Sequence, residues 1–373
     1  MIKIMFMIHD LGHGGAEKVL VNLVNHLDRT RFDITVIALF GGGVNEQFLK
    51  PDIHYKTIFK KAFRGNSHVM KLFSSELLHR MFVKEHYDIE VSYLEGVAAR
   101  IVSGCPDGDT KLVSWIHVEQ HTRAVAAKAF RSYAESERCY QRFDHTVCVS
   151  QYVKEDFMSL YPTVRNVSVL YNTNETEQIL LLKDEPAEDG VFADGEIRLI
   201  GVGKLMPVKG FDKLARIHKR LRGEGYPVHT YVLGEGPERG RIEAYLEENN
   251  LKESFTLLGY RTNPYKYVSK CDLFVCASTA EGFSTAATEA LIVGTPVCTV
   301  DVSGMKEMLG ENDEYGVVTE NSEEALYRGI KQLLDDLALL AYYREKAEER
   351  GKTFGTENTV RAVEDMMEQL IKA

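Results

Sequence analysis

The sequence predicts an α/β protein of two domains, each built on a parallel β-sheet with helices on both faces. Short, continuous apolar runs alternate with amphipathic stretches along nearly the whole chain. Such runs are typical of strands that are buried on both faces, and the stretches between them suit the covering helices. The length of 373 residues also fits two domains of roughly 150–200 residues each.

In the first half, a strand at Ile2–Ile8 leads into a glycine-rich turn, and a helix with apolar residues at helical spacing follows. The remaining strands of this half are expected at Ile34–Phe40, Ile89–Leu94, Lys111–Ile116, Thr146–Val149 and Val167–Leu170. Helical stretches separate these strands, which is the pattern of a parallel sheet.

A change of composition ends this half. Residues 183–190 are acidic and rich in turn-forming residues, which indicates a linker. We therefore assign residues 1–178 to an N-terminal domain, residues 179–196 to a linker and residues 197–355 to a C-terminal domain. The last helix, at about residues 356–373, has no strand after it, and we expect it to pack back on the N-terminal domain.

The second half repeats the alternation. Its strands are expected at Ile197–Val202, Val228–Leu233, Ser254–Leu257, Leu273–Ala277 and Pro296–Val300. The helices between them are expected to begin near Phe211, Pro237, Asn263, Thr285 and Gly304. We expect the two sheet domains to face each other across a central cleft.

Composition narrows the class of protein. Hydrophobic residues make up 44% and charged residues 27%, which is typical of a folded globular protein, and the net charge of −10 argues against a general nucleic-acid binder. No apolar run reaches the ~18–20 residues of a membrane helix, and Met1–Ile8 is too short for a signal peptide. The six cysteines lack the spacing of a zinc site, so we expect buried free thiols in a cytoplasmic protein.

One segment is locally basic. Lys56–Lys84 interleaves aromatic residues with lysines and arginines, and Glu76 is its only acidic residue. This composition leads us to expect contact with an anionic membrane surface at the inner face of the membrane. A solvated helix face is the alternative. The basic and aromatic stretch Arg123–Arg142, expected as one helix, is a second candidate for such contact.

Candidate binding residues follow the carboxyl ends of predicted strands, where parallel sheets bind ligands and helix N-termini present amides. Gly14 and Gly15 open the first helix, and their small size would let a phosphate or an acceptor come close. In the second half, Lys204 and Lys209 flank a constrained turn that starts at Gly203, within reach of a diphosphate. The alternatives are ordinary tight turns and solvated lysines, and neither a P-loop nor a dinucleotide fingerprint is present.

Two further loops carry candidate residues. His117 follows the predicted strand Lys111–Ile116 and should face a ligand, although a lone histidine is often structural. Glu281 ends the loop after a later strand, and Glu289 lies in the helix that follows. Because ionised carboxylates accept hydrogen bonds from pairs of hydroxyls, one could bind a sugar and the other a ribose. A solvated helix charge is the alternative for Glu289, but its neighbours are apolar.

The spacing of Glu281 and Glu289, Glu-x7-Glu, resembles that of the retaining glycosyltransferase family 4, whose members have two Rossmann-like domains in the GT-B arrangement. Other stretches resemble the motifs of this family in the same order and spacing: Gly14–Glu17, Gly203–Gly210 and Leu233–Pro237. The resemblance covers nearly the whole chain. It implies an enzyme that takes a sugar from a nucleoside diphosphate sugar, by family habit a UDP-sugar.

The resemblance also implies roles for the candidate residues. Lys204 and Lys209 would hold the donor diphosphate, and Glu289 the ribose. Glu281 would bind the donor sugar, and His117 would lie near the reacting carbon. The residues implied to assist donor binding are Gly282, Phe283, Ser284, Thr285, Tyr260 and Arg261. The family usually has arginine where this chain has Lys204, and a lysine keeps the charge but loses the two-pronged hydrogen bonding.

The implied reaction retains the anomeric configuration and delivers the sugar to a hydroxyl of a lipid-linked or growing glycan, as in surface polysaccharide or glycolipid biosynthesis. No cofactor is expected. Asp107 and Asp109 match the Asp-x-Asp of metal-dependent transferases, but Pro106 and Gly108 indicate a turn there, so no metal is expected. Two other functions stay open: a nucleotide-sugar epimerase of the same fold and a non-catalytic carbohydrate-binding protein.

Overall fold

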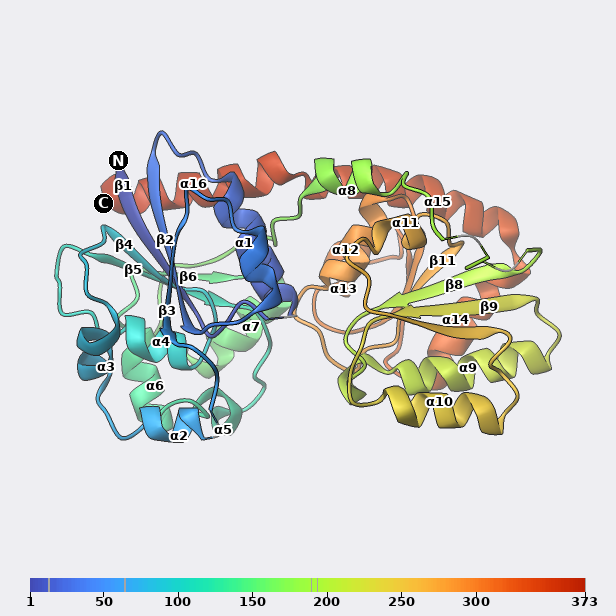
Figure 1. Ribbon diagram of the computed structural model, residues 1–373, viewed down its shortest axis with the longest axis horizontal. Coiled ribbons are helices and arrows are strands. Elements are labelled where there is room, and N and C mark those ends of the chain that lie inside the picture. Colours follow the sequence, from blue (N-terminus) through green and yellow to red (C-terminus); the bar gives the residue numbers. More distant parts are fainter. Residues whose placement is uncertain (13, 64, 189, 193, 373) are drawn as a thin grey trace. The chain divides into compact units, whose positions relative to one another are not determined.

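The computed structural model describes residues 1–12, 14–63, 65–188, 190–192 and 194–372. The chain divides into two compact units, each with its own sheet (Figure 1). Unit 1 comprises Met1–Asn174 together with Thr356–Ala373, and unit 2 comprises Glu175–Gly355.

The sheet of unit 1 has seven strands in the order β3-β2-β1-β4-β5-β6-β7, and all of its paired strands run parallel. The strands are β1 (Ile2–Ile8), β2 (Phe32–Phe40), β3 (His54–Phe59), β4 (Ile89–Ser92), β5 (Lys111–Ile116), β6 (His145–Cys148) and β7 (Val167–Val169). The order of the strands reverses between β1 and β4, and ligands of open parallel sheets bind outside the carboxyl ends at such a point.

Helices surround this sheet. They are α1 (Gly15–His26), η1 (Val44–Phe48), α2 (Asn66–Met70), α3 (Ser75–Phe82), α4 (Val97–Val102), α5 (Arg123–Ala126), α6 (Tyr133–Tyr140), α7 (Gln151–Leu160) and α16 (Thr356–Lys372). The Arg31 guanidinium, just before β2, pairs with Glu364 at 2.7 Å and with Glu368 at 2.6 Å on α16. The expected packing of the last helix on the N-terminal region is therefore confirmed.

Unit 2 has a six-stranded parallel sheet in the order β10-β9-β8-β11-β12-β13. Its strands are β8 (Ile197–Val202), β9 (Val228–Leu233), β10 (Phe255–Gly259), β11 (Leu273–Cys276), β12 (Val297–Val300) and β13 (Val317–Thr319). Its helices are α8 (Thr176–Leu182), η2 (Pro207–Lys209), α9 (Phe211–Gly223), α10 (Arg239–Glu248), α11 (Tyr265–Val268), α12 (Thr285–Ile292), α13 (Met305–Leu309), α14 (Glu323–Asp335), α15 (Leu337–Gly351) and η3 (Lys352–Phe354). Two parallel α/β sheets confirm the predicted fold class.

The sequence missed two strands, and both lie at sheet edges. In β3, His54, Lys56 and Thr57 are exposed, so this strand lacks the continuous apolar run of a central strand. The other missed strand, β13, has only three residues. The expectation that Lys56–Lys84 could be one solvated helix face is wrong, because the segment contains the end of β3 and two short helices.

The stretch Arg123–Arg142 is also not one helix. It breaks between α5 and α6, where Phe130 is buried and the hydroxyl of Ser132 accepts a hydrogen bond from Glu135 N to start α6. Such a capping contact favours a new helix start over a continuous helix.

The cysteines and the apolar character of the helices bear on two further sequence features. All six cysteines are free and buried, as predicted. Among the described helices, none combines the length and the apolar character that crossing a bilayer requires.

Candidate functional site

Two loops of unit 2 leave the carboxyl ends of neighbouring strands. β8 and β11 pair directly in the sheet, and the chain order reverses between them. The loop after β8 runs through residues 203–210 into α9, and the loop after β11 runs through residues 277–284 into α12. We call this reversal of strand order the switch point of unit 2. Ligands of open parallel sheets are expected to bind at such a point.

An ion pair joins the two loops. Lys209 Nζ lies 2.6 Å from Glu281 Oε1, and the Ser278 hydroxyl donates to the same carboxylate oxygen at 2.6 Å. The Lys209 side chain is 29% exposed and that of Glu281 is 11% exposed. The structure thus brings together two predicted site residues and adds Ser278, which the sequence analysis missed although it directly follows a strand end.

The backbone holds these loops at close range. Thr279 N donates to Val208 O at 2.7 Å. Gly210 has φ +65°, and a Cβ there would lie 2.2 Å from Ala277 O. Any residue with a side chain would therefore be strained at position 210 and would push the two loops apart.

The loop after β8 is also fastened to the loop after β9. Gly203 N donates to Leu233 O at 2.9 Å, and Leu205 N donates to Glu235 O at 3.0 Å. A Cβ on Gly234 would lie 1.9 Å from Gly203 O, so this glycine permits the contact. The side chain of Lys204, between these bonds, is exposed, and within the described part of the chain no hydrogen bond or ion pair engages its ammonium group.

The first turn of α12 is defined by its cap. The Ser284 hydroxyl accepts from Ala287 N at 3.3 Å, and Thr285 is the first helical residue. Gly282 and Phe283 pack against Gly304, where a Cβ would lie 2.8 Å from the Phe283 ring. The start of α12 is therefore closely packed. The backbone amides of its first turn that Ser284 does not cap could stabilise an anion.

Glu289 lies farther along α12 and is buried. The Tyr265 hydroxyl of α11 donates to Glu289 Oε1 at 3.3 Å. Glu289 is therefore not the solvated helix charge that stood as the alternative.

Tyr260 and Arg261 follow the carboxyl end of β10, at the edge of the sheet. Arg261 Nε donates to the Tyr267 hydroxyl at 3.2 Å, while Tyr260 is exposed. Gly259, at φ +75°, accepts a bond from Gly234 N at 2.9 Å, which links this end of the sheet to the loop after β9.

In unit 1, Gly14 is the N-cap of α1 and Gly15 is its first residue. A Cβ on Gly14 would lie 1.9 Å from Glu17 Oε2. The absence of a side chain thus lets the Glu17 carboxylate fold back toward the helix start, where negative charge is favoured.

His117 directly follows β5 and is only 7% exposed. Burial lowers the pKa of His117 to about 3, although a hydrogen bond with the Tyr93 backbone opposes this change, so the imidazole is neutral at neutral pH. Its Nε2 is buried without a hydrogen-bond partner among the described residues. An orphaned buried nitrogen at a strand's carboxyl end is a candidate ligand contact.

Glu95, which the sequence analysis missed, supports His117. Its Oε2 accepts from His117 N at 3.1 Å, and burial raises the pKa of Glu95. Its position just beyond the end of β4, next to β5 in the sheet, is the signal that could have found it.

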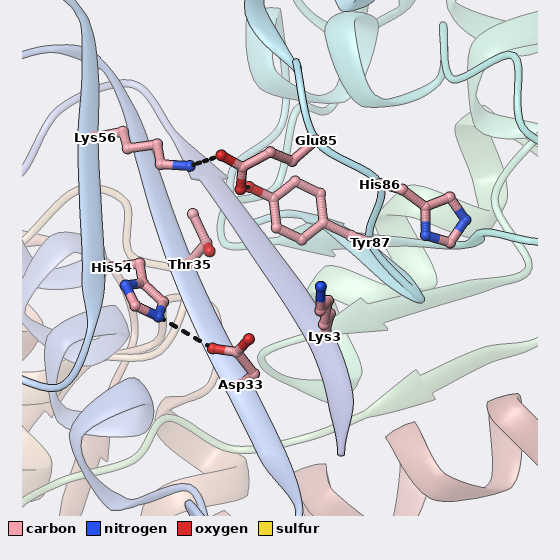
Figure 2. Close-up of a pocket in the computed structure, with 8 residues that line it drawn as sticks. All are labelled: Lys3, Asp33, Thr35, His54, Lys56, Glu85, His86 and Tyr87. Atoms are coloured by element: carbon pink, nitrogen blue, oxygen red, sulfur yellow. Dashed lines mark hydrogen bonds and ion pairs between the residues drawn. The ribbon is translucent and has the colours of Figure 1, made fainter.

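A polar pocket of about 480 Å³ lies at the other edge of unit 1, at the amino ends of its strands. Figure 2 shows its lining residues, which are Lys3, Asp33, Thr35, His54, Lys56, Glu85, His86 and Tyr87. Its charged groups pair with one another, as Lys56 does with Glu85 at 2.6 Å and His54 with Asp33 at 3.3 Å. This pocket includes none of the predicted site residues.

Comparisons with known proteins identify the family of this chain. Residues 13–178 match the profile described as Glycosyltransferase Family 4, and residues 183–350 match that of Glycosyl transferases group 1. A similar protein is the N-acetylgalactosamine-N,N'-diacetylbacillosaminyl-diphospho-undecaprenol 4-alpha-N-acetylgalactosaminyltransferase of Campylobacter jejuni, 28% identical over the whole of both chains. The lipopolysaccharide core biosynthesis glycosyltransferase LpsD of Rhizobium meliloti is 24% identical over 98% of this chain and 96% of its own length.

Among solved structures, Anabaena HepE in complex with UDP superposes with a TM-score of 0.78 at 18% identity, covering 99% of this chain and 100% of that one. This likeness confirms the GT-B fold. The fold and the two profiles define a sugar-transferring enzyme of the two-sheet class. The chain belongs to glycosyltransferase family 4, among the glycosyl transferases of group 1.

Proposed function

We propose that this glycosyltransferase moves a sugar from a UDP-sugar to a hydroxyl of a lipid-linked or growing glycan, with retention of the anomeric configuration. In this proposal residues 197–355 bind the donor and residues 1–178 bind the acceptor. The observation that carries it is the Lys209–Glu281 pair at the switch point of unit 2, 2.6 Å apart and supported by Ser278.

Lys209 would stabilise the charge that develops on the leaving diphosphate. Its ammonium is already fixed by Glu281, and the N-terminus of α12 adds oriented amides in the same unit. Charges that are positioned before the reaction need no reorganisation when the transition state forms. Lys204, whose exposed side chain has no partner among the described residues, would contribute a second cation.

The carboxylates would bind hydroxyls of the donor. Glu281 is proposed to bind the donor sugar and Glu289 the ribose, because ionised carboxylates accept hydrogen bonds only. Gly282, Phe283, Ser284 and Thr285 would present backbone groups to the donor, and Tyr260 and Arg261 would border the base.

His117 is proposed to contact the sugar near the reacting carbon. A neutral imidazole can exchange hydrogen bonds with sugar hydroxyls without placing a positive charge beside an oxocarbenium-like transition state. The family resemblance implies attack from the face of the leaving group, with the phosphate accepting the proton of the acceptor. No protein nucleophile is then needed.

UDP is the donor nucleotide that two observations favour. The similar HepE structure is a complex with UDP, and the family resemblance implies the same nucleotide. The name of the Campylobacter relative specifies a diphospho-undecaprenol acceptor, and that of LpsD specifies lipopolysaccharide core biosynthesis. These names support a glycan acceptor that is carried on a lipid.

The two basic segments meet on one surface of unit 1, which suits such an acceptor. Arg131 Nε, in the turn after α5, donates to Lys71 O at 3.0 Å, just after α2. Buried Arg100 holds the turn after α2 in place, because it donates to Met70 O at 2.8 Å and to Phe73 O at 2.6 Å. Figure 1 shows α2 and α5 on the same side of unit 1.

We call this surface the α2–α5 surface and define it by its exposed residues Val69, Leu72, Arg123, Val125, Lys128 and Arg131. Leu72 is 78% exposed and Val125 is 53% exposed, so apolar side chains stand among the basic ones. Basic residues attract anionic lipid headgroups, and exposed apolar side chains can enter the interface. We propose that the enzyme works at the cytoplasmic face of a membrane through this surface.

A donor screen tests the proposed reaction. UDP-, GDP- and ADP-sugars are each assayed for hydrolysis and for protection against thermal unfolding. We expect UDP-sugars to be hydrolysed slowly and to raise Tm, while the other donors do neither. A changed sugar without any acceptor would indicate the epimerase, and the absence of any effect on Tm would indicate a protein that does not use nucleotide sugars.

Liposome flotation tests the membrane contact. We expect the protein to bind vesicles that contain phosphatidylglycerol and not vesicles of phosphatidylcholine alone. The double variant Arg123→Glu with Lys128→Glu should lose this binding, because each basic residue near an anionic surface contributes about 1 kcal/mol. The control is Lys219→Glu with Lys352→Glu, which makes the same change of charge on exposed lysines of unit 2. Equal binding by both double variants would contradict the assignment of the surface.

A further inference from the structure

Three polar side chains meet in the interior of unit 1. They are His79 on α3, Glu90 on β4 and Cys105 in the loop after α4. His79 Nε2 lies 2.8 Å from Glu90 Oε2 and 3.1 Å from Oε1, and Cys105 Sγ lies 3.8 Å from Glu90 Oε1. Their exposed fractions are 6%, 2% and 1%.

The proposed sugar transfer does not use this cluster. Glu90 is the second residue of β4, toward the amino end of the strand, whereas the site residues of unit 1 follow the carboxyl ends. A buried carboxylate and a buried imidazole are costly to keep in a protein interior unless a specific partner compensates for lost hydration. His79 and Glu90 supply this compensation to each other at 2.8 Å, and Cys105 Sγ adds a third donor atom beside them.

We propose that His79, Glu90 and Cys105 bind one Zn²⁺ ion. An imidazole nitrogen, a carboxylate oxygen and a thiolate are the donor types that zinc prefers in proteins. Three of these protein ligands leave a fourth position of the tetrahedron for a water molecule.

The distances suit this ion. Donor atoms at zinc–ligand lengths of about 2.0–2.3 Å stand about 3.3–3.6 Å apart in a tetrahedron. The ligand atoms of the cluster all lie within 4.8 Å of one another, and the pairs given above span 2.8–3.8 Å. The His79–Glu90 pair would open by about 0.5 Å to reach the tetrahedral spacing.

The backbone already holds the ligand-bearing elements together. A Cβ on Gly104 would lie 2.1 Å from Ser75 O, so the loop that carries Cys105 packs directly on the start of α3. Glu90 belongs to a strand that pairs with its neighbours on both sides. The ion would therefore find its ligands in place on three rigid elements, which is the condition for a preorganised site.

The charge of the occupied site also favours the ion. A neutral imidazole, a carboxylate, a thiolate and Zn²⁺ together have no net charge, so the buried site avoids the penalty of burying a free ion.

Metal analysis of two cysteine variants tests the proposal. The protein is produced in medium supplemented with Zn²⁺, passed through a desalting column and analysed for metal. We expect about one equivalent of zinc in the wild type and in Cys139→Ser, and a loss of at least fivefold in Cys105→Ser. Cys139 is a matched control, because it is also a buried free thiol of unit 1. Equal zinc in the wild type and in Cys105→Ser overturns the proposal.

Cobalt gives a readout that does not depend on whether the variant folds. Wild-type protein produced with Co²⁺ should show the near-ultraviolet charge-transfer absorption of a thiolate–cobalt bond together with the visible bands of a tetrahedral ion. The same absorption in Cys139→Ser and its loss in Cys105→Ser assign the thiolate to Cys105. Cobalt-loaded wild type without a thiolate band overturns the site even if Cys105→Ser cannot be purified.

Discussion

The carboxyl ends of the strands differ between the two units in how their polar groups are used. In unit 2, Lys209 and Glu281 are paired and the loops that carry them are joined by backbone bonds through positions where only glycine fits. In unit 1, His117 is neutral and its buried Nε2 has no partner among the described residues. Unit 2 thus presents a charged pair that is fixed in position, and unit 1 presents a neutral imidazole whose Nε2 has no partner among the described residues.

This difference indicates a division of labour. A diphosphate is the same in every nucleotide-sugar donor, so a rigid charged site suits it. Close to a sugar that acquires positive charge, a neutral hydrogen-bonding group is more suitable than an ionised one. The following predictions test each side of this comparison, from the largest expected effect to the smallest.

Lys209→Ala should remove the fixed charge of unit 2. We expect kcat to fall about 10²- to 10³-fold, or about 3–4 kcal/mol, because the leaving diphosphate loses its cation and Glu281 loses its partner. The measurement is steady-state transfer or donor hydrolysis with the nucleotide sugar that the screen identifies.

The control for this variant is Lys219→Ala, an exposed lysine on the same unit. It should leave kcat unchanged, and both variants should keep the circular dichroism of the wild type. Near-normal turnover by Lys209→Ala would refute its role in the reaction.

Gly210→Ala should disturb the same loops without removing a charge. At φ +65° and with a Cβ 2.2 Å from Ala277 O, alanine should destabilise unit 2 by about 2–3 kcal/mol and lower its Tm by several degrees. Gly240→Ala is the control, because a Cβ at that helical position meets nothing within 4 Å and should be neutral or slightly stabilising. Similar Tm values for the two variants would show that the close approach of the loops is not required.

His117 should make unit 1 less stable in acid. Its pKa is about 3 in the folded protein and about 6.5 when unfolded, so below pH 6.5 the unfolded chain binds a proton that the folded chain does not. Stability therefore falls as the pH drops from 6.5 toward 3, by about 2 kcal/mol at pH 5. In His117→Gln, the loss of Tm between pH 7 and pH 5 should be smaller than in the wild type.

The exposed His68 provides the control for this pH dependence. His68→Gln should keep the wild-type difference in Tm between the two pH values. If His117→Gln keeps it as well, the imidazole is not held neutral by burial and the comparison between the units fails.

Ser278→Ala should have the smallest effect. It removes one hydrogen bond to Glu281 Oε1, so we expect kcat/KM to fall about 5- to 10-fold, which corresponds to about 1–1.4 kcal/mol. Thr279→Val is the matched control, because that hydroxyl contacts Val208 O and not Glu281. An equal loss in both variants would assign the effect to the loop as a whole.

The sequence predicted best those features that only a few residue types can form, such as buried strands and turns with a positive φ. Lys209 and Glu281 are distant in the chain, yet each was placed after a strand, and neighbouring parallel strands bring such positions to one edge. Gly210 marked a turn that strongly favours glycine, because its φ is positive and a Cβ there would meet Ala277 O. The central strands were found because they are buried on both faces and therefore apolar.

The features that the sequence missed depend on contacts between residues far apart in the chain, and such contacts produce no pattern in the local sequence. The edge strand β3 is half exposed and mixes polar with apolar residues, so it lacks the continuous apolar run that identified the central strands. Glu95 becomes a candidate only through its hydrogen bond with His117, and Ser278 only through its bond to Glu281. The cluster of His79, Glu90 and Cys105 comes from three separate elements, so no ligand spacing could reveal it.

The pairing of Arg31 with α16 has a consequence for the order in which the chain folds. Unit 1 is interrupted after Asn174 and is completed only by Thr356–Lys372, where Thr356 Oγ1 also donates to Asn174 O at 2.6 Å. During synthesis, the whole of unit 2 leaves the ribosome before the last helix does, and domains generally fold as they emerge. Unit 2 can therefore be finished while unit 1 still exposes the surface that α16 will cover, so completion of unit 1 waits for α16.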